Sequence, residues 1–181
     1  MFVIVSGSSG VGKNTVINRL LETDDRVKAM VTNTTRAMRV GEVDGVNYNF
    51  ITMKEFDDKL KSGDICEWEE IHGNYYGSSL KDIMDTVASG KVLLKDLGVE
   101  GAVNMQKVLS NKVPVISIFL TAPKKELIKR LIGRGETQVD LRMQRYDYEH
   151  TFLDKYDYVI NNYDLEDTVN QIKNIITKHK K

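Results

Sequence analysis

Residues 2–15, FVIVSGSSGVGKNT, contain a short apolar run followed by a glycine-rich loop. The run at residues 2–5 predicts a buried strand, and the apolar stripe over residues 16–21 predicts a helix directly after the loop. Glycines let the backbone N–H groups of such a loop surround a phosphate, the helix N-terminus adds partial positive charge, and Lys13 reaches the terminal phosphates. This context predicts a nucleotide-phosphate site (a P-loop) rather than a plain strand-to-helix turn.

One position of the loop departs from the usual pattern. That pattern places Ser or Thr directly after the lysine, where its hydroxyl contacts Mg²⁺. This chain has Asn14 there, and the hydroxyl follows one residue later at Thr15. Thr15 is therefore the candidate hydroxyl on the metal side.

The composition limits the class of protein. A chain of 181 residues suits a single domain with one core and a small inserted lobe. Its 26 basic residues balance 26 acidic ones, so no net basic field attracts nucleic acid or an anionic membrane. The lone Cys66 excludes an internal disulfide framework and a cysteine-based zinc site, and favours a small buried side chain. Without a membrane-span or leader pattern, we expect a cytoplasmic protein.

Five short apolar runs predict buried strands that alternate with helical patterns. The runs are residues 2–5, 27–31, 92–94, 115–120 and 158–160, and the later helical patterns cover residues 99–109, 127–132 and 169–176, with Asp164 as the N-cap of the last. Such alternation predicts an α/β fold of three layers, in which helices cover both faces of a parallel sheet. Ligands of such sheets bind at the carboxyl ends of the strands.

Two segments interrupt this rhythm. Between residues 33 and 76, glycines separate shorter strand-like pieces, and a capping box at Thr52 and Glu55 opens one helix. This segment predicts a small, more antiparallel lobe inserted into the sheet domain. Residues 133–137 (GRGET) separate two helical patterns, and their composition predicts a lid that moves over phosphates.

Arginines lie beside these loops, as expected if two phosphate groups must be brought together. Arg36 and Arg39 fall in one segment, and Arg130 and Arg134 are four residues apart, which aligns them on one helical face. A single surface arginine is usually a solvated charge, so the argument depends on the position of the set.

Three further segments carry a specific resemblance. Residues 41–48 (GEVDGVNY), 67–68 (EW) and 73–78 (GNYYGS) resemble the acceptor lobe of guanylate kinases, and with the P-loop and the TTR segment at 34–36 the resemblance covers essentially the whole chain. It implies a P-loop nucleoside monophosphate kinase with a five-stranded parallel sheet. The implied parts are a core at residues 1–32 and 79–181, a mixed β GMP-binding lobe at 33–78, and a lid at about 133–141.

The resemblance also implies an activity and a set of site residues. The activity is transfer of the γ-phosphate of ATP to GMP, and to dGMP, with Mg²⁺ as the cofactor. The ATP-binding residues are Gly7, Ser8, Ser9, Gly10, Val11, Gly12, Lys13, Asn14, Thr15 and Asn162. The GMP-binding residues are Thr32, Arg36, Arg39, Tyr48, Glu67, Tyr76, Ser78 and Asp96. The catalytic residues are Lys13, Arg36, Arg130, Arg134 and Arg142.

The third lid arginine depends on the alignment. Arg142, with Glu149 seven residues later, fits the family spacing if the lid is a few residues shorter than usual. Without that shortening, Arg145 takes the position.

The chemistry of guanine agrees with the role implied for Glu67. Guanine presents two adjacent donors that one carboxylate accepts together, whereas adenine presents a ring acceptor to the same carboxylate. One departure concerns the same region, because Asp96 keeps the first of two acids of the family pattern and Gly98 replaces the second. We therefore expect weaker GMP binding than the family pattern gives.

The sequence leaves two alternative functions to consider. Guanylate-kinase-like domains also occur as protein-binding modules, but these usually lack a workable P-loop. A P-loop kinase of another small phosphorylated acceptor, such as a sugar phosphate, would give Glu67 and Ser78 no base to bind. We expect small-molecule substrates and neither a nucleic-acid nor a membrane partner, and a monomer and a homodimer are both compatible with the sequence.

Overall fold

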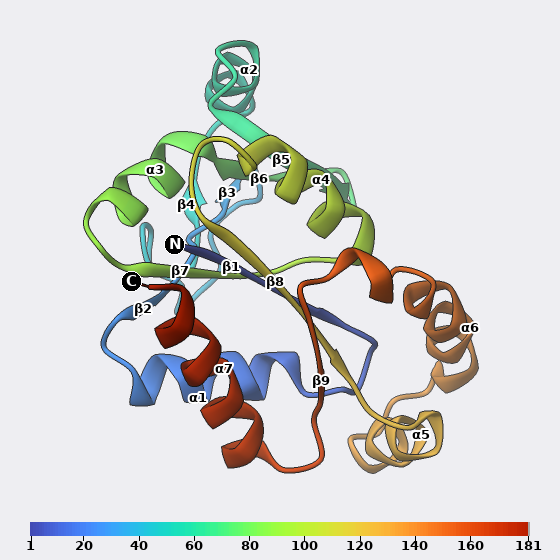
Figure 1. Ribbon diagram of the computed structural model, residues 1–181. Helices are drawn as coiled ribbons and strands as arrows, with labels where there is room; N and C mark the ends of the chain where they lie inside the picture. The colour runs from blue at the N-terminus through green and yellow to red at the C-terminus, as the bar shows by residue number, and fades with distance from the viewer. Residues whose placement is uncertain (181) are drawn as a thin grey trace.

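A computed structural model describes residues 1–180 of the chain. Its main sheet has five parallel strands in the order β2-β7-β1-β8-β9 (Figure 1). The strands are β1 (Phe2–Gly7), β2 (Val27–Ala29), β7 (Val92–Asp96), β8 (Val115–Thr121) and β9 (Tyr158–Asn161). All five predicted strands and the predicted parallel sheet are confirmed.

Helices cover both faces of this sheet. Helices α1 (Lys13–Thr23) and α7 (Leu165–His179) pack on one face, and α3 (Leu80–Ala88) and α4 (Val99–Leu109) pack on the other (Figure 1). Alternate residues of β1 point to opposite faces of the sheet. Val3 and Val5 pack in the core on the side of α1 and α7, and Phe2 and Ile4 pack in the core on the side of α3 and α4. The predicted three-layer arrangement is confirmed, as is the Asp164 cap of α7, which accepts from the backbone N–H of Asp167 at 2.9 Å.

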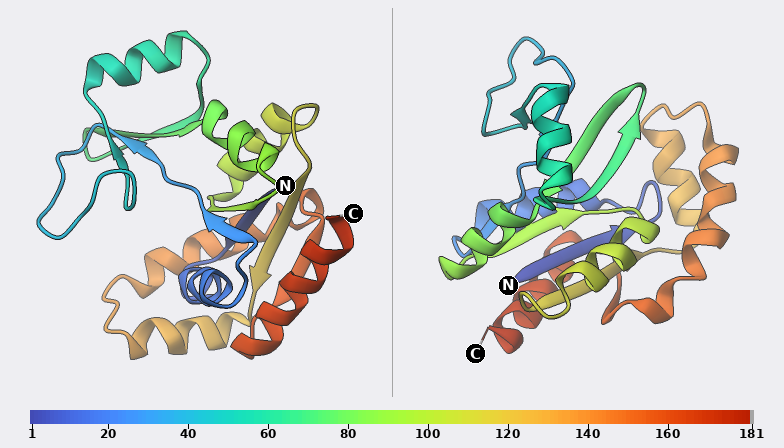
Figure 2. Two further views of the ribbon diagram at one scale, coloured as in Figure 1. Left: turned by 90° about the vertical axis from the view of Figure 1, so that its left-hand side faces the viewer. Right: turned by 90° about the horizontal axis from the view of Figure 1, so that it is seen from above.

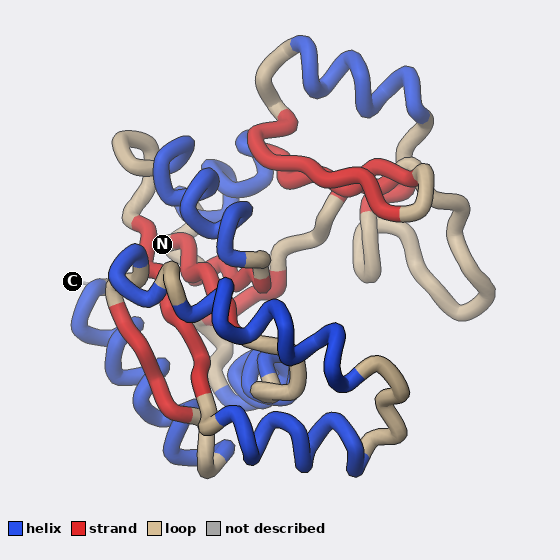
Figure 3. The backbone as a smooth tube through the Cα atoms, turned by 90° about the vertical axis from the view of Figure 1, so that its right-hand side faces the viewer, coloured by secondary structure: helices blue, strands red, loops and turns tan. Residues whose placement is uncertain are grey.

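A second sheet of four strands stands apart from the main one, with one helix above it (Figure 3). In the order of the sheet the strands are β4 (Asn49–Phe50), β3 (Asn33–Thr34), β6 (Asn74–Ser79) and β5 (Ile65–Ile71), and the helix is α2 (Met53–Lys61). Strands β3 and β4 are parallel and the other pairs are antiparallel. The expected capping box is present, since Thr52 and Glu55 each accept from the other's backbone N–H.

Helices α5 (Lys124–Gly133) and α6 (Val139–His150) are joined by residues 134–138 and followed by the short helix η1 (Leu153–Lys155). This connection contains most of the segment expected to form a lid. It extends to the same side of the main sheet as the second sheet does (Figure 2). Within residues 1–180, no helix has the length and apolarity needed to cross a membrane.

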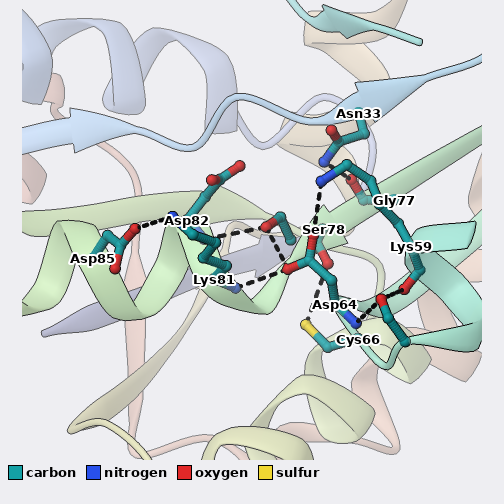
Figure 4. A network of polar contacts seen from close by, with 11 residues as sticks. Asn33, Lys59, Asp64, Cys66, Gly77, Ser78, Lys81, Asp82 and Asp85 are labelled. Atoms are coloured by element: carbon teal, nitrogen blue, oxygen red, sulfur yellow. Dashed lines mark hydrogen bonds and ion pairs between the residues drawn. The ribbon is translucent and has the colours of Figure 1, made fainter. Parts of the chain in front are cut away.

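Asp64 connects the second sheet to the core (Figure 4). Its carboxylate accepts from Lys59 Nζ at 2.8 Å, from Ser79 Oγ at 2.8 Å and from the backbone N–H of Lys81 at 3.0 Å. Burial acts to raise the pKa of Asp64, but these donors outweigh it and hold the pKa below its usual value. Ser79 also caps α3, so the network fixes the point where β6 becomes a helix.

Candidate nucleotide-binding site

The P-loop leaves the carboxyl end of β1, between β7 and β8, and ends at the first turn of α1. Gly12 is the N-cap of α1 at φ 95°, and a Cβ there would lie 2.9 Å from Asn162 Nδ2, so both the backbone and the space require glycine. Lys13 Nζ donates to the Gly7 carbonyl at 2.5 Å. Ser8 Oγ is buried and has no hydrogen-bond partner among residues 1–180.

Residues far along the chain brace this loop. The Val11 carbonyl accepts from Asn162 Nδ2 at 2.7 Å and from Arg130 at 3.4 Å. Arg130 also donates to the Asn162 carbonyl at 3.0 Å, and Arg134 donates to Ser9 Oγ at 3.4 Å. The structure therefore brings three of the predicted ATP-side residues onto the loop. The side-chain amide of Asn162 is engaged by protein on both sides, because its Oδ1 accepts from Thr168 at 2.8 Å.

The charge of Lys13 is set by its surroundings. Burial lowers the pKa of the Lys13 ammonium, and the nearby carboxylates of Glu149 and Asp96 oppose that fall. The loop lysine is thus held in a partly buried, partly acidic environment that an incoming polyphosphate would enter.

A cleft of about 1020 Å³ extends from the P-loop to the second sheet. The predicted residues that line it are Gly7, Ser9, Lys13, Thr32, Tyr48, Glu67, Tyr76, Asp96 and Arg142. Arg145 and Glu149 of α6 line it as well, so both candidates for the third lid arginine face the same space. The cleft joins the phosphate loop to the candidate base-binding residues.

A β-bulge shapes the far end of this cleft. Between Ile65 and Glu67 the register of β5 shifts against β6, so that Glu67 pairs with Ser78. Ser78 Oγ donates to Glu67 Oε2 at 3.1 Å. Burial raises the pKa of the Glu67 carboxyl, while Lys95 and the Ser78 hydroxyl oppose the rise.

The bulge also explains the position of Cys66. The thiol was expected to be a small buried side chain, but the residue is only half-buried. It lies at the bulge and donates to the Ser78 carbonyl at 3.3 Å. Burial raises the pKa of the Cys66 thiol to about 11.

The two acceptor-side arginines lie outside the lining of the main cleft. Arg36 forms an ion pair with Glu42 at 2.7 Å, and its guanidinium carbon lies 5.4 Å from the centre of the Tyr48 ring. The Tyr48 and Tyr76 rings meet edge to face at 5.8 Å, so Arg36 belongs to the same group of side chains. Arg39 is exposed, and its backbone N–H donates to Glu42 Oε2 at 2.8 Å.

A smaller hollow of about 350 Å³ lies near the loop and the start of α7. It is lined by Gly10, Gly12, Thr15, Arg130, Arg134, Asn162, Tyr163 and Leu165. Thr15 is therefore placed beside the loop glycines and two of the arginines. Asn14 lies on the same first turn of α1 and is exposed.

In the connection between α5 and α6, Glu136 links two arginines. Its carboxylate accepts from Arg142 at 2.6 Å and lies 3.6 Å from Arg134. These donors hold the pKa of Glu136 below its usual value, with the backbone N–H of Gln138 contributing most. Two of the expected catalytic arginines are thus linked through one acid in the segment expected to form a lid.

No metal cage is built from side chains in the part of the chain that the structure describes, because no group of three or more His, Cys, Asp or Glu could hold an ion there. Mg²⁺ keeps several waters and is commonly bound through substrate phosphates with few protein ligands. The exposed Thr15 hydroxyl beside the loop fits a site of that kind.

The sequence pattern does not predict two charged residues of the site. Glu42 holds Arg36, and Lys95 donates to Thr32 Oγ1. A signal exists for each: Glu42 lies in the same short loop as both arginines, and Lys95 is a charge at the carboxyl end of the otherwise apolar strand β7.

Comparisons with known proteins agree with this geometry. The guanylate kinase family model matches residues 1–179. A guanylate kinase from Prochlorococcus marinus subsp. pastoris is 38% identical over 96% of this chain and 95% of its own length. One from Halalkalibacterium halodurans is 38% identical over 98% of this chain and 87% of its own. The crystal structure of guanylate kinase from Anaplasma phagocytophilum has a TM-score of 0.72 at 32% identity, over 99% of this chain and 86% of that one. The chain therefore belongs to the guanylate kinase family and is a nucleoside monophosphate kinase.

Proposed function

We propose that this protein transfers the γ-phosphate of ATP to GMP, giving ADP and GDP, in the cleft between the P-loop and the second sheet. One observation carries the proposal: a single cleft has Gly7 and Lys13 at one end and Glu67, Tyr48 and Tyr76 at the other. A phosphoryl group can move between two nucleotides only where both phosphates reach one space. This cleft offers that space.

On the donor side, the P-loop amides, Ser8 Oγ and Lys13 bind the ATP phosphates. The Lys13 ammonium exchanges its contact with the Gly7 carbonyl for the phosphates, since a charged partner is the stronger acceptor. The smaller hollow beside Asn162 takes the adenosine. Thr15 would be the candidate hydroxyl to hold Mg²⁺, and the bound ion would supply neutralisation of charge on the phosphates.

On the acceptor side, Glu67, Ser78 and Thr32 bind the guanine, with Asp96 beside them. The phosphate of GMP is bound by Arg36, Arg39, Tyr48 and Tyr76. Because Arg36 is already oriented by Glu42 and packed on Tyr48, little ordering remains when the phosphate arrives. The acceptor lobe at residues 33–78 closes over the bound nucleotide.

The transfer step needs charge neutralisation more than proton transfer. The GMP phosphate is already an oxyanion near neutral pH, so no general base is required. Arg130, Arg134 and Arg142 stabilise the charge that builds on the transferred group. Closure of the lid at about residues 133–141 brings Arg142 toward the phosphates and excludes water.

A panel of acceptors tests the proposal. ADP release is measured with ATP, Mg²⁺ and each of GMP, dGMP, AMP, UMP and CMP. We expect turnover with GMP and dGMP. The protein is proposed to work in the cytoplasm as a monomer or homodimer. Thr15→Val should weaken the dependence of the rate on Mg²⁺. No turnover with any nucleotide would favour a protein-binding module, and turnover only with another phosphorylated acceptor would favour the second alternative.

A further inference from the structure

Lys95 is an unusual residue for its position. It lies in β7, an interior strand of the main sheet, directly after the buried residues Val92, Leu93 and Leu94. A charged side chain rarely occupies such a place without a partner. Its ammonium donates to Thr32 Oγ1, and its side chain lines the main cleft with Glu67. Lys95 is therefore a cation at the base-binding end of the cleft.

Within residues 1–180, the Lys95 ammonium has donors that no hydrogen bond uses. An ammonium group has three N–H donors, and the contact with Thr32 uses one of them. Glu67 and Lys95 line the same cleft, and the positive charge of Lys95 opposes the rise in the pKa of the Glu67 carboxyl. A ligand that fits there must offer donors to Glu67 and, beside them, an acceptor for Lys95.

Guanine has this pattern on one edge. Its N1–H and N2–H₂ donors lie side by side, and the O6 acceptor lies next to N1. We propose that Lys95 is a base-recognising residue that donates a hydrogen bond to the O6 carbonyl of the acceptor nucleotide, next to the two donors that Glu67 accepts. This inference rests on the proposed function, because it assigns one more contact to the same GMP site.

With both contacts, the site rejects adenine at two positions of the base. Adenine presents a ring acceptor toward Glu67 and an amino donor toward Lys95, so both contacts become mismatched. Hypoxanthine keeps N1–H and O6 and lacks only the 2-amino group, so it retains the Lys95 contact. Discrimination at C6 is assigned to Lys95, and discrimination at C2 to Glu67.

The test compares GMP, IMP and 6-thio-GMP in steady-state assays of the full chain. Lys95→Met should raise the KM for GMP by about tenfold to a hundredfold, the size of a hydrogen bond to a charged group. We expect kcat to change little, because the chemistry is at the phosphate. Sulfur is a poor acceptor, so the preference for GMP over 6-thio-GMP should collapse in this variant. The preference for GMP over IMP should stay, because both carry O6.

Control variants separate recognition from structure. Lys107→Met removes an exposed lysine of α4 and should behave as wild type. Lys95→Gln keeps a neutral donor and should lose less affinity than Lys95→Met. Glu67→Gln should reduce the preference for GMP over IMP instead. Protection against thermal unfolding by ATP shows that each variant is folded.

The outcomes distinguish this inference from the proposed function. If wild type uses GMP and Lys95→Met keeps both its KM and its preference over 6-thio-GMP, the role of Lys95 is overturned and the function stands. If Lys95→Met only lowers the unfolding temperature, Lys95 is a structural partner of Thr32, which also overturns it. If wild type binds ATP but uses no guanine nucleotide, the proposed function itself fails.

Discussion

The two regions that face the main cleft are built in different ways. The ATP side is one continuous loop at a strand-to-helix junction, and side chains from distant segments hold its backbone, as Asn162 and Arg130 do at the Val11 carbonyl. The acceptor side is assembled from side chains of several separate segments, held by ion pairs such as Arg36 with Glu42 and by the Asp64 network. Substitutions in the loop should therefore lower kcat/KM for both substrates, whereas substitutions on the acceptor side should change the KM for GMP alone.

The largest expected effect comes from the loop. Lys13→Ala should lower kcat/KM for both substrates by about a hundredfold to a thousandfold, the loss typical of one charge-stabilising donor. The fold should persist, because the substitution removes a partly buried charge and leaves the loop backbone contacts in place. ADP release and thermal unfolding measure the two effects. Activity within tenfold of wild type would contradict the role of Lys13.

The second effect should be confined to the acceptor side. Arg36→Ala is expected to raise the KM for GMP by about tenfold to a hundredfold, because a charged contact to the phosphate is lost. The KM for ATP should stay the same. Arg19→Ala is the matched control, since Arg19 pairs with Glu166 on the exposed surface. An equal change in both Michaelis constants would remove the contrast between the two regions.

The third prediction concerns stability of the acceptor side. Asp64→Asn should lower the free energy of unfolding by about 2 kcal/mol, because three donors lose a charged acceptor. The folded pKa of Asp64 lies below its unfolded value, so this stabilisation is fully present above about pH 4 and is lost as the pH falls through the folded value.

Urea unfolding of wild type and variant over a pH series measures this effect. The difference between the two should begin to shrink below about pH 4, as Asp64 of the unfolded chain takes up a proton, and should vanish below the folded pKa, where native Asp64 is protonated too. Asp58→Asn is the control, because Asp58 pairs with Lys54 on an exposed helix face and should change little. A constant difference at all pH values would show that the charge of Asp64 is not what stabilises the junction.

The smallest effect is a gain. Gly98 lines the main cleft at the N-cap of α4, and its φ is −63°. Apart from Gly98 and its two chain neighbours, no heavy atom of residues 1–180 lies within 4 Å of an added Cβ. Gly98→Asp should lower the KM for GMP by about threefold to tenfold, as one added hydrogen-bond acceptor would. Gly98→Ala fills the same space without a carboxylate and serves as the control. An unchanged or raised KM for GMP in the Asp variant would count against this prediction.

The same contrast explains how much the sequence could predict. The P-loop, the five parallel strands and the three layers follow from local periodicity, because each depends on neighbouring residues. The roles of Glu42 and Lys95 depend on contacts between side chains that local periodicity does not encode. The bulge that pairs Glu67 with Ser78 also has no local signature, since a one-residue shift of register depends on the partner strand.

The expected site residues also fall into two groups, those that contact the P-loop and those that lie or pair elsewhere. Arg130, Arg134 and Asn162 contact the P-loop, because they lie near helix and strand ends beside it. Arg36 and Arg39 lie outside the lining of the main cleft, and Arg142 of α6 is paired with Glu136 of the connection between α5 and α6. Their positions depend on contacts between separate segments, which the spacing of residues along the chain does not determine.

The half-buried cysteine at the bulge provides a natural probe whose alkylation rate can be measured. With a pKa of about 11, the Cys66 thiol is almost entirely protonated at neutral pH, and only the thiolate reacts with alkylating agents. Partial burial and the nearby Glu67 carboxylate therefore slow alkylation of this thiol, and opening of the bulge to solvent should speed it. A faster rate of alkylation under native conditions would thus report loosening of β5 at the bulge next to Glu67, without any engineered label.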